Sequence, residues 1–300
     1  MIISDFNSLF KTLSERGKRR LVVANGTDNH TLEAVSNAFD NNLVTVKITG
    51  RKDLIESECT TCRIDVNKFE IIDCPDEQSA VDTAVEIASK GGADLIMKGL
   101  ISTDVYVKSI LRKDTGLLEE GSLLSHVTVI LNKSYPKPLI VSDVAVIPLP
   151  TLEQKVRMTE YLIDVAHKLG IQIPKVAFLA ASEKVSQRMQ ATLDANELKK
   201  LWENGRFPDS LCDGPMALDL AIDPESVEIK NFISPVAGDA DCLLFPNIES
   251  GNVFYKVNTK FCNAETAAIL VGTKVPVILS SRGDTIQTKL NSIALAALLG

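Results

Sequence analysis

Short hydrophobic runs alternate with amphipathic segments along most of this chain. The runs have the length and composition of buried strands, and the segments between them place apolar residues at helical spacing. Strand-like runs cover residues 21–24, 43–48, 69–72, 93–97, 127–131, 139–142, 175–180, 242–245, 267–271 and 275–279. Helical patterns cover residues 31–39, 77–89, 152–169 and 192–204, a segment that includes Tyr255 and Lys256, and a last segment that ends at Ala297. Because strands that alternate with helices of this length form parallel βαβ units, we predict an α/β fold with mostly parallel sheets and flanking helices.

The length of the chain favours two lobes. A protein of 300 residues is at the upper end for a single hydrophobic core. The turn-rich residues 132–138 have the composition of a linker, and apolar runs resume only near the C-terminus. We therefore predict a discontinuous first lobe, residues 1–136 and 278–300, and a second lobe, residues 137–277.

Composition and charge narrow the possible function. The chain is 45% hydrophobic and 24% charged, which is ordinary for a globular protein and excludes extended disorder. Its net charge is −7, and no basic stretch is interleaved with aromatic residues, so we expect no nucleic-acid partner. The N-terminus lacks a signal peptide's apolar core, and no apolar run approaches ~20 residues. We expect a cytoplasmic protein with no membrane contact.

Six cysteines fit a reducing compartment, because most stand singly in apolar surroundings. Cys59 and Cys62 have the spacing of half a zinc site or of a redox pair, but a second CxxC or a pair of histidines is missing. We interpret them as two loop cysteines. Several aspartates lie in separate turns, where aspartate commonly bonds the local backbone, so we expect no metal site.

The clearest candidate for chemistry is the polar turn that follows the strand-like run 275–279. Ser281 and Arg282 lie in this turn, and a helical segment begins just after it. Hydroxyl groups, a guanidinium and free N–H groups at a helix start suit a phosphate or a developing oxyanion. A simple helix N-cap with one surface arginine has the same pattern.

Two further strand ends carry polar groups, and functional groups collect at such ends in parallel sheets. Lys98 ends one strand and is followed by Ser102, Thr103 and a helix that carries Lys108. Ser or Thr at this position is also typical of an N-cap. Ser125 and His126 begin another strand, where His126 can be a general base or a buried histidine bonded to the backbone.

The sequence contains none of four common catalytic or nucleotide-binding motifs. The dinucleotide fingerprint, the Walker loop, the HExxH helix and the GxSxG elbow are all absent.

Several motifs together resemble the phosphate acetyl/butyryltransferase family. The most specific is Ser234-Pro235-Val236-Ala237-Gly238-Asp239-Ala240-Asp241, followed by Gly251-Asn252 and Tyr255-Lys256. The others, in family order, are Lys98-Gly99-Leu100 with Ser102-Thr103, Leu124-Ser125-His126-Val127, Glu183-Lys184-Val185, Ala191-Thr192-Leu193-Asp194-Ala195, Asp213-Gly214-Pro215 with Ala217-Leu218-Asp219, and Ser281-Arg282. The combination of the Lys98 and Leu124 motifs looks more like the phosphate butyryltransferase branch than the acetyl branch.

The resemblance implies reversible transfer of a butyryl or other short-chain acyl group between CoA and inorganic phosphate. It implies direct attack of the CoA thiolate on the acyl phosphate, with CoA and phosphate as substrates and no bound cofactor. It also implies a homo-oligomer with a two-lobed fold related to isocitrate and isopropylmalate dehydrogenases. The active site then lies in the cleft between the lobes.

The resemblance also assigns roles to single residues. Arg282 then binds phosphate and Ser281 stabilises the tetrahedral intermediate. The acetyl branch has a catalytic aspartate at the position of Thr288, so the role of base falls on Asp284 here. Lys108 takes the place of a second phosphate-binding arginine. The remaining expected substrate contacts are Lys98, Ser102, Thr103, Ser125, His126, Asp239 and Asn252.

Two other functions remain open at the level of sequence. A NAD-dependent hydroxy-acid dehydrogenase of the related fold would need a nicotinamide pocket and usually a set of metal-binding aspartates. A non-catalytic CoA- or phosphate-binding module would bind ligand without turnover.

Overall fold

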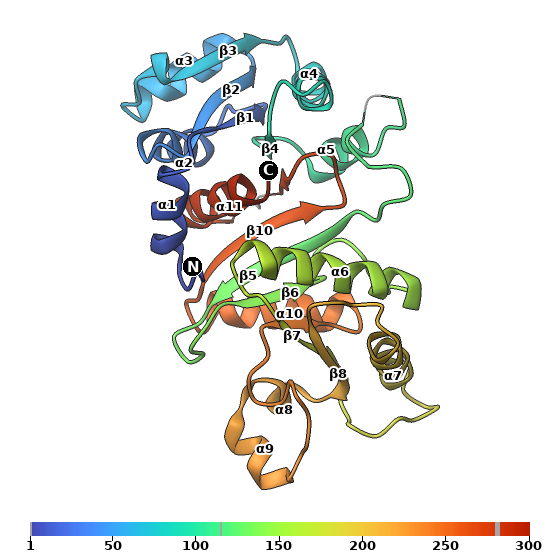
Figure 1. Ribbon diagram of the computed structural model, residues 1–300. Coiled ribbons are helices and arrows are strands. Elements are labelled where there is room, and N and C mark those ends of the chain that lie inside the picture. Colours follow the sequence, from blue (N-terminus) through green and yellow to red (C-terminus); the bar gives the residue numbers. More distant parts are fainter. Residues whose placement is uncertain (1, 115, 280–282) are drawn as a thin grey trace. The chain divides into compact units, whose positions relative to one another are not determined.

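The computed structural model describes residues 2–114, 116–279 and 283–300, which form two compact units. The central unit comprises Ser125–Thr266 with the N-terminal residues up to Asp5. The terminal unit comprises Phe6–Leu124 and Ala267–Gly300. In Figure 1 the terminal unit contains the blue, teal and dark red elements, and the central unit the green, yellow and orange ones.

These boundaries differ from the predicted lobes, 1–136 with 278–300 and 137–277. Residues 132–138 join two antiparallel strands of the central unit, so they form a turn and not a linker between lobes. The chain returns to the terminal unit at Ala267, within a strand whose pattern is continuous across the boundary. In all, the chain passes from one unit to the other after Asp5, Leu124 and Thr266.

The sheet of the terminal unit follows the order β3-β2-β1-β4-β11-β10. Its strands are β1 (Arg19–Ala24), β2 (Val44–Gly50), β3 (Phe69–Asp73), β4 (Leu95–Lys98), β11 (Val277–Ile278) and most of β10 (Glu265–Val271). The first five are parallel, and β10 runs antiparallel to β11. The pairing of Ala24 with both Thr49 and Lys98 brings the carboxyl ends of β1, β2 and β4 together.

Helices cover this sheet with their buried apolar faces. They are α1 (Phe6–Ser14), α2 (Asn29–Asp40), α3 (Lys52–Thr61), α4 (Glu77–Ser89), α5 (Thr103–Ile110) and α11 (Ile286–Leu299), with a short 3₁₀ turn, η1 (Val66–Lys68). The side chain of Asp28 caps α2 and that of Asp76 caps α4, which explains why these two helices begin where they do. Helix α11 packs against α2 and α1 and is buried over most of its length.

The sheet of the central unit follows the order β5-β6-β9-β7-β8. Its strands are β5 (Ser125–Leu131), β6 (Leu139–Ser142), β7 (Lys175–Leu179), β8 (Leu211–Met216) and β9 (Cys242–Leu244). Its helices are α6 (Leu152–Lys168), α7 (Gln190–Glu203), α8 (Leu218–Ile222), α9 (Pro224–Lys230) and α10 (Ile248–Lys260). Only β5 runs antiparallel to its neighbour. Apolar side chains of β6, β7, β9, α8 and the segments around them form one buried core.

The prediction of an α/β fold with mostly parallel sheets and flanking helices is confirmed (Figure 1). Among the residues that the structure describes, no helix is long and apolar enough to cross a membrane.

Candidate active site

The carboxyl end of β4 presents the first group of candidate residues, in the terminal unit. Lys98 is the last residue of β4 and is only 3% exposed. The backbone N–H of Gly99 donates to the Ala24 carbonyl at 2.9 Å. A Cβ at Gly99 would lie 2.3 Å from the Asn25 carbonyl oxygen, so only glycine permits this close approach of β4 to β1.

Ser102 and Thr103 form the start of α5. The Ser102 hydroxyl accepts from the Val105 N–H at 3.3 Å, so Ser102 is an N-cap. Its own N–H donates to the Glu77 carboxylate at 3.1 Å, which replaces the glutamate that a capping box would carry within the helix. Thr103 is exposed, and Lys108 is exposed in the last turn, ~8 Å further along the helix axis. Hydroxyl and ammonium groups therefore line an exposed segment at the end of β4.

The predicted residues Ser281 and Arg282 lie outside the residues that the structure describes. Asp284 is half-buried just before α11, which Thr285 caps by accepting from the Thr288 N–H at 3.1 Å. The helix start predicted after the serine-arginine turn is thus present.

Lys289 is a candidate that the motif comparison missed. It lies near the start of α11 and is 5% exposed. Burial lowers the pKa of its ammonium group, while the nearby carboxylates of Asp28 and Asp284 act in the opposite direction. The sequence signal was a lysine at a position where the helical pattern calls for a buried residue.

In the central unit, Asp143 connects the second group of candidates. Its Oδ2 accepts from the Ser125 hydroxyl and from the His126 N–H, both at 3.0 Å. Its Oδ1 accepts from the N–H groups of Ala145 and Val146, both at 2.8 Å. Asp143 is 1% exposed, so this carboxylate holds the start of β5 against the end of β6.

Ser125 and His126 are both buried. Because the Ser125 hydroxyl donates to Asp143, it has no proton left to donate to a substrate oxygen. The His126 ring lies with its Nδ1 3.3 Å from the Thr128 hydroxyl. The structure therefore agrees better with a buried His126 than with an exposed general base.

Asn252 joins the same group from α10. Its side-chain amide donates to the Val144 carbonyl at 2.9 Å. A Cβ at the preceding Gly251 would lie 2.3 Å from the Asp143 carbonyl oxygen, so this glycine lets α10 approach the end of β6. The Gly251-Asn252 motif thus has a structural reason, since both residues contact the turn after β6.

Asp239, another predicted substrate contact, does not lie with Ser125 and Asn252. It forms ion pairs with Lys137, just before β6, and with Lys175, at the start of β7, at 2.7 Å each. Burial raises the pKa of the Asp239 carboxyl. Hydrogen bonds and charge from the two lysines lower this pKa by a larger amount, so the net shift is downward. Because Asp239 precedes β9, it belongs to the amino edge of these parallel strands, whereas Asp143 follows the carboxyl end of β6. Its role here is to fasten the loop before β9.

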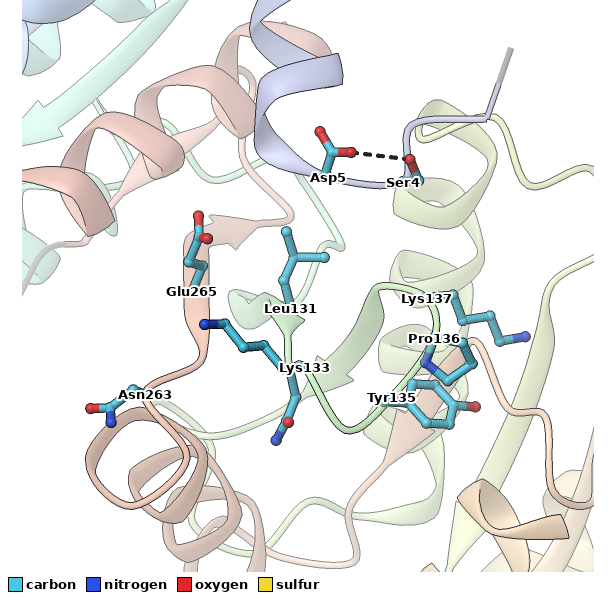
Figure 2. A pocket seen from close by; sticks show the side chains of 10 residues that line it. Ser4, Asp5, Leu131, Lys133, Tyr135, Pro136, Lys137, Asn263 and Glu265 are labelled. Atoms are coloured by element: carbon cyan, nitrogen blue, oxygen red, sulfur yellow. Dashed lines mark hydrogen bonds between the residues drawn. The ribbon is translucent and has the colours of Figure 1, made fainter.

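A pocket of about 180 Å³ lies near this amino edge of the central unit (Figure 2). Lys133, Tyr135 and Lys137 line it from the turn between β5 and β6 (Figure 2), and Asp5 and Glu265 add carboxylates. Its mixture of charges does not single out an anionic ligand, and we assign it no part in the reaction.

Cys59 and Cys62 are not loop cysteines, as the sequence had suggested. Cys59 lies within α3, and Cys62 is the C-cap of this helix. Burial raises the pKa of Cys59 to about 11, and it also raises the pKa of Cys62, where Glu33 and Glu58 add to the effect. A helix C-terminus further disfavours a thiolate, so this pair has no feature of a reactive thiol.

Burial also raises the pKa of the Cys212 thiol to about 12 and that of Cys242 well above its ordinary value. None of these four thiols is prepared to act as a nucleophile. Within residues 2–114, 116–279 and 283–300, no three His, Cys, Asp or Glu side chains are grouped so that they could hold a metal ion.

Comparison with known proteins gives a consistent set of similarities. Residues 76–297 match the profile of a family described as phosphate acetyl/butaryl transferase. The chain is 40% identical to a phosphate butyryltransferase from Clostridium acetobutylicum, over 99% of both proteins. It is 39% identical to a phosphate acetyltransferase from Thermotoga maritima, over 94% of this chain and 96% of that protein. A crystal structure of a branched-chain phosphotransacylase from Enterococcus faecalis superposes with a TM-score of 0.83 and 29% identity, over 93% of this chain and 99% of the other.

Proposed function

Because this chain belongs to the phosphate acetyl/butaryl transferase family, we propose that it is a phosphate acyltransferase. It transfers a butyryl or other short-chain acyl group between CoA and inorganic phosphate. The observation that carries this proposal is the identity of 40% to a phosphate butyryltransferase over nearly the whole chain. The alternatives of a hydroxy-acid dehydrogenase and of a non-catalytic module are not favoured, because relatives of this similarity and coverage are named as phosphate acyltransferases.

In the proposed reaction a phosphate oxygen attacks the thioester carbonyl of acyl-CoA. The tetrahedral intermediate collapses, the carbon–sulfur bond breaks, and the CoA thiolate leaves and takes up a proton. In the reverse direction the thiolate attacks the carbonyl of the acyl phosphate, the bond from the acyl carbon to the phosphate oxygen breaks, and inorganic phosphate leaves. The activation free energy of both directions is lowered by cations around the phosphate, by donors to the oxyanion and by a group that exchanges a proton with the thiol.

The terminal unit supplies the phosphate and base functions in this proposal. Arg282 and Lys108 bind the phosphate, and Ser281 donates to the oxyanion. Asp284, half-buried beside the start of α11, accepts the thiol proton. Lys98, Ser102 and Thr103 offer further donors at the end of β4, where the exposed start of α5 supports an anion-binding role.

The central unit supplies residues that hold or contact the substrates. His126 and Asn252 stay proposed substrate contacts around the turn after β6. Ser125 becomes a positioning residue, because its hydroxyl already donates to Asp143. Asp239 is left out, because it pairs with Lys137 and Lys175 at the amino edge.

Four further properties stay predictions. They are the cytoplasmic location, the homo-oligomer, the lack of a bound cofactor and the relation in fold to isocitrate and isopropylmalate dehydrogenases.

The test is release of free CoA, followed with a thiol reagent, from a series of acyl-CoA substrates of increasing chain length. We expect release that depends on phosphate and is fastest for short acyl chains. Absence of phosphate-dependent release for every acyl-CoA would refute the proposed function.

A further inference from the structure

The connection between β4 and α5, residues 99–102, belongs to neither a strand nor a helix. Its position therefore depends on contacts with the rest of the terminal unit. Ile101 is 2% exposed and anchors the segment by packing, whereas Leu100 is 43% exposed and Ser102 is exposed. Hydrogen bonds at Leu100 and Ser102 therefore add to the packing of Ile101 in giving the order that a binding segment needs.

Asn25, the first residue after β1, makes these bonds. Its carbonyl accepts from the Leu100 N–H at 2.9 Å, and its side-chain amide donates to the Leu100 carbonyl at 2.7 Å. Asn25 thus bonds both backbone polar groups of Leu100. At the other end of the connection, the Glu77 carboxylate accepts from the Ser102 N–H at 3.1 Å.

The conformation of Asn25 is itself fixed by its neighbours. Its φ of 53° is in the left-handed region, which asparagine adopts more readily than most residues. Its N–H donates to the Thr49 hydroxyl at 3.4 Å, and that hydroxyl donates in turn to the Ala80 carbonyl at 2.7 Å. A Cβ at Gly50 would lie 3.0 Å from the Asn25 Oδ1, so glycine there leaves room for the amide. These contacts orient the Asn25 side-chain amide towards the Leu100 carbonyl.

We propose that Asn25 is a positioning residue for acyl transfer, whose side-chain amide holds the Leu100 carbonyl and thereby places Ser102 and Thr103 for phosphate. This inference rests on the proposed function, in which that segment binds phosphate. Asn25 does not touch the substrate itself. Its loss should therefore change phosphate binding more than the chemical step.

The test compares Asn25→Gly with wild-type protein and with Asn42→Gly. Glycine keeps the left-handed backbone at both sites, and Asn42, with φ of 62°, lies in the exposed turn after α2. Loss of one such hydrogen bond should raise the KM for phosphate about five- to tenfold, with kcat and the KM for acyl-CoA within about twofold of wild type. Asn42→Gly should leave all three constants unchanged. Asn25→Asp should raise the KM for phosphate further, because it sets a carboxylate oxygen against the Leu100 carbonyl.

A KM for phosphate that stays at the wild-type value in Asn25→Gly and Asn25→Asp would overturn the inference. A fall in kcat and Tm with no change in that KM would also overturn it, since it would indicate a general structural role. Failure of the proposed function is a separate result, in which wild-type protein releases no CoA with phosphate. In that case the rise in Tm on addition of phosphate is compared between wild-type and Asn25→Gly protein. A smaller rise in Asn25→Gly would still support an anion-binding segment held by Asn25. An equal rise in both proteins would overturn the role of Asn25.

Discussion

At the scale of single residues, Asp143 holds the candidate residues Ser125 and His126 of the central unit next to the turn after β6. Four N–H or O–H groups donate to its two oxygens, and the side chain is almost fully buried. A buried carboxylate whose oxygens already accept four hydrogen bonds is a structural acceptor with little capacity left for a substrate. The reactive role therefore falls on other residues.

Asp143→Asn should lower the free energy of unfolding by about 2–3 kcal/mol, because the new NH₂ group faces existing donors and leaves them unpaired. Ser125→Ala removes one donor and should lower it by about 1 kcal/mol. Urea unfolding measures both. Asp209→Asn, at an exposed turn with φ of 53°, is the control and should have little effect. Wild-type stability of Asp143→Asn would contradict this description of the site.

Arg282 is proposed to bind phosphate through two parallel hydrogen bonds. Arg282→Ala should lower kcat/KM for phosphate about 100-fold or more, because both the charge and the fork are lost. Arg282→Lys keeps the charge without the fork and should be intermediate. Steady-state rates at varied phosphate concentration test this, and activity of Arg282→Ala near the wild-type value would show that the anion site lies elsewhere.

Lys289 should give stability a characteristic pH dependence. The folded-state pKa of Lys289 lies below the ordinary value of 10.5, because burial penalises the charged ammonium group. As pH rises through the folded-state pKa towards 10.5, the unfolded state binds more protons than the folded state, and the cost of the buried charge is relieved. Over this range the Tm of wild-type protein should therefore rise relative to that of Lys289→Met. Lys11→Met, at an exposed lysine of α1, should show no such trend.

The candidate site was predictable from sequence only as far as motifs mark it. The position of Ser102 as a helix cap followed from its residue type, and the structure agrees. The ion pairs of Asp239 with Lys137 and Lys175 could not be predicted, because they join segments that are far apart in the sequence. Asn25 and Lys289 were missed because their roles depend on which distant segments lie beside them.

At the scale of elements, strong periodicity was a reliable guide. The pattern predicted α4 with the bounds that the structure has, and α6 to within one residue at its end. It missed α3, whose apolar positions are few, and also α1, although Phe6, Leu9, Phe10 and Leu13 have helical spacing there. It also missed β8, because residues 211–216 contain Asp213-Gly214-Pro215 and look like a turn.

The structure explains why such a sequence forms a strand. β8 is the last strand in the order of the central sheet, where a proline without an N–H is tolerated. The buried Asp213 is paired with Lys199 at 2.7 Å. A Cβ at Gly214 would lie 2.6 Å from the Phe178 carbonyl oxygen, so glycine permits the close pairing with β7. These tertiary contacts override local propensity.

The approach of β4 to β1 makes a prediction at the same scale. Gly99→Ala adds a methyl group against the Asn25 carbonyl and must shift the start of the β4–α5 connection. We expect a loss of about 1–3 kcal/mol in the free energy of unfolding, as for overpacking, together with a higher KM for phosphate. Gly17→Ala has a positive φ but no atom within 4 Å of its Cβ, so it reports backbone strain alone. An unchanged KM in Gly99→Ala would indicate that the connection does not bind phosphate.

At the scale of the whole molecule, both units place their candidate groups at the carboxyl ends of parallel strands. The terminal unit does so after β4 and the central unit after β6. This placement follows from the βαβ pattern, which is why the sequence could predict it before any motif was assigned. The boundaries between the units at Ser125 and Ala267 could not be predicted, because one coincides with the first residue of β5 and the other lies inside β10.

The cysteines allow a last test that covers the whole chain. Of the six, only Cys262 is exposed, whereas Cys62 is half-buried and the other four are buried. An aromatic disulfide reagent should therefore react rapidly with one thiol of the native protein and with six after denaturation. Cys262→Ser should abolish the rapid phase and keep full phosphate-dependent release of CoA, because the proposed transfer is direct and uses no thiol of the protein. Loss of turnover in this variant, with its stability unchanged, would instead point to a covalent acyl-enzyme. Several rapidly reacting thiols in the native protein would contradict the buried positions of the other cysteines.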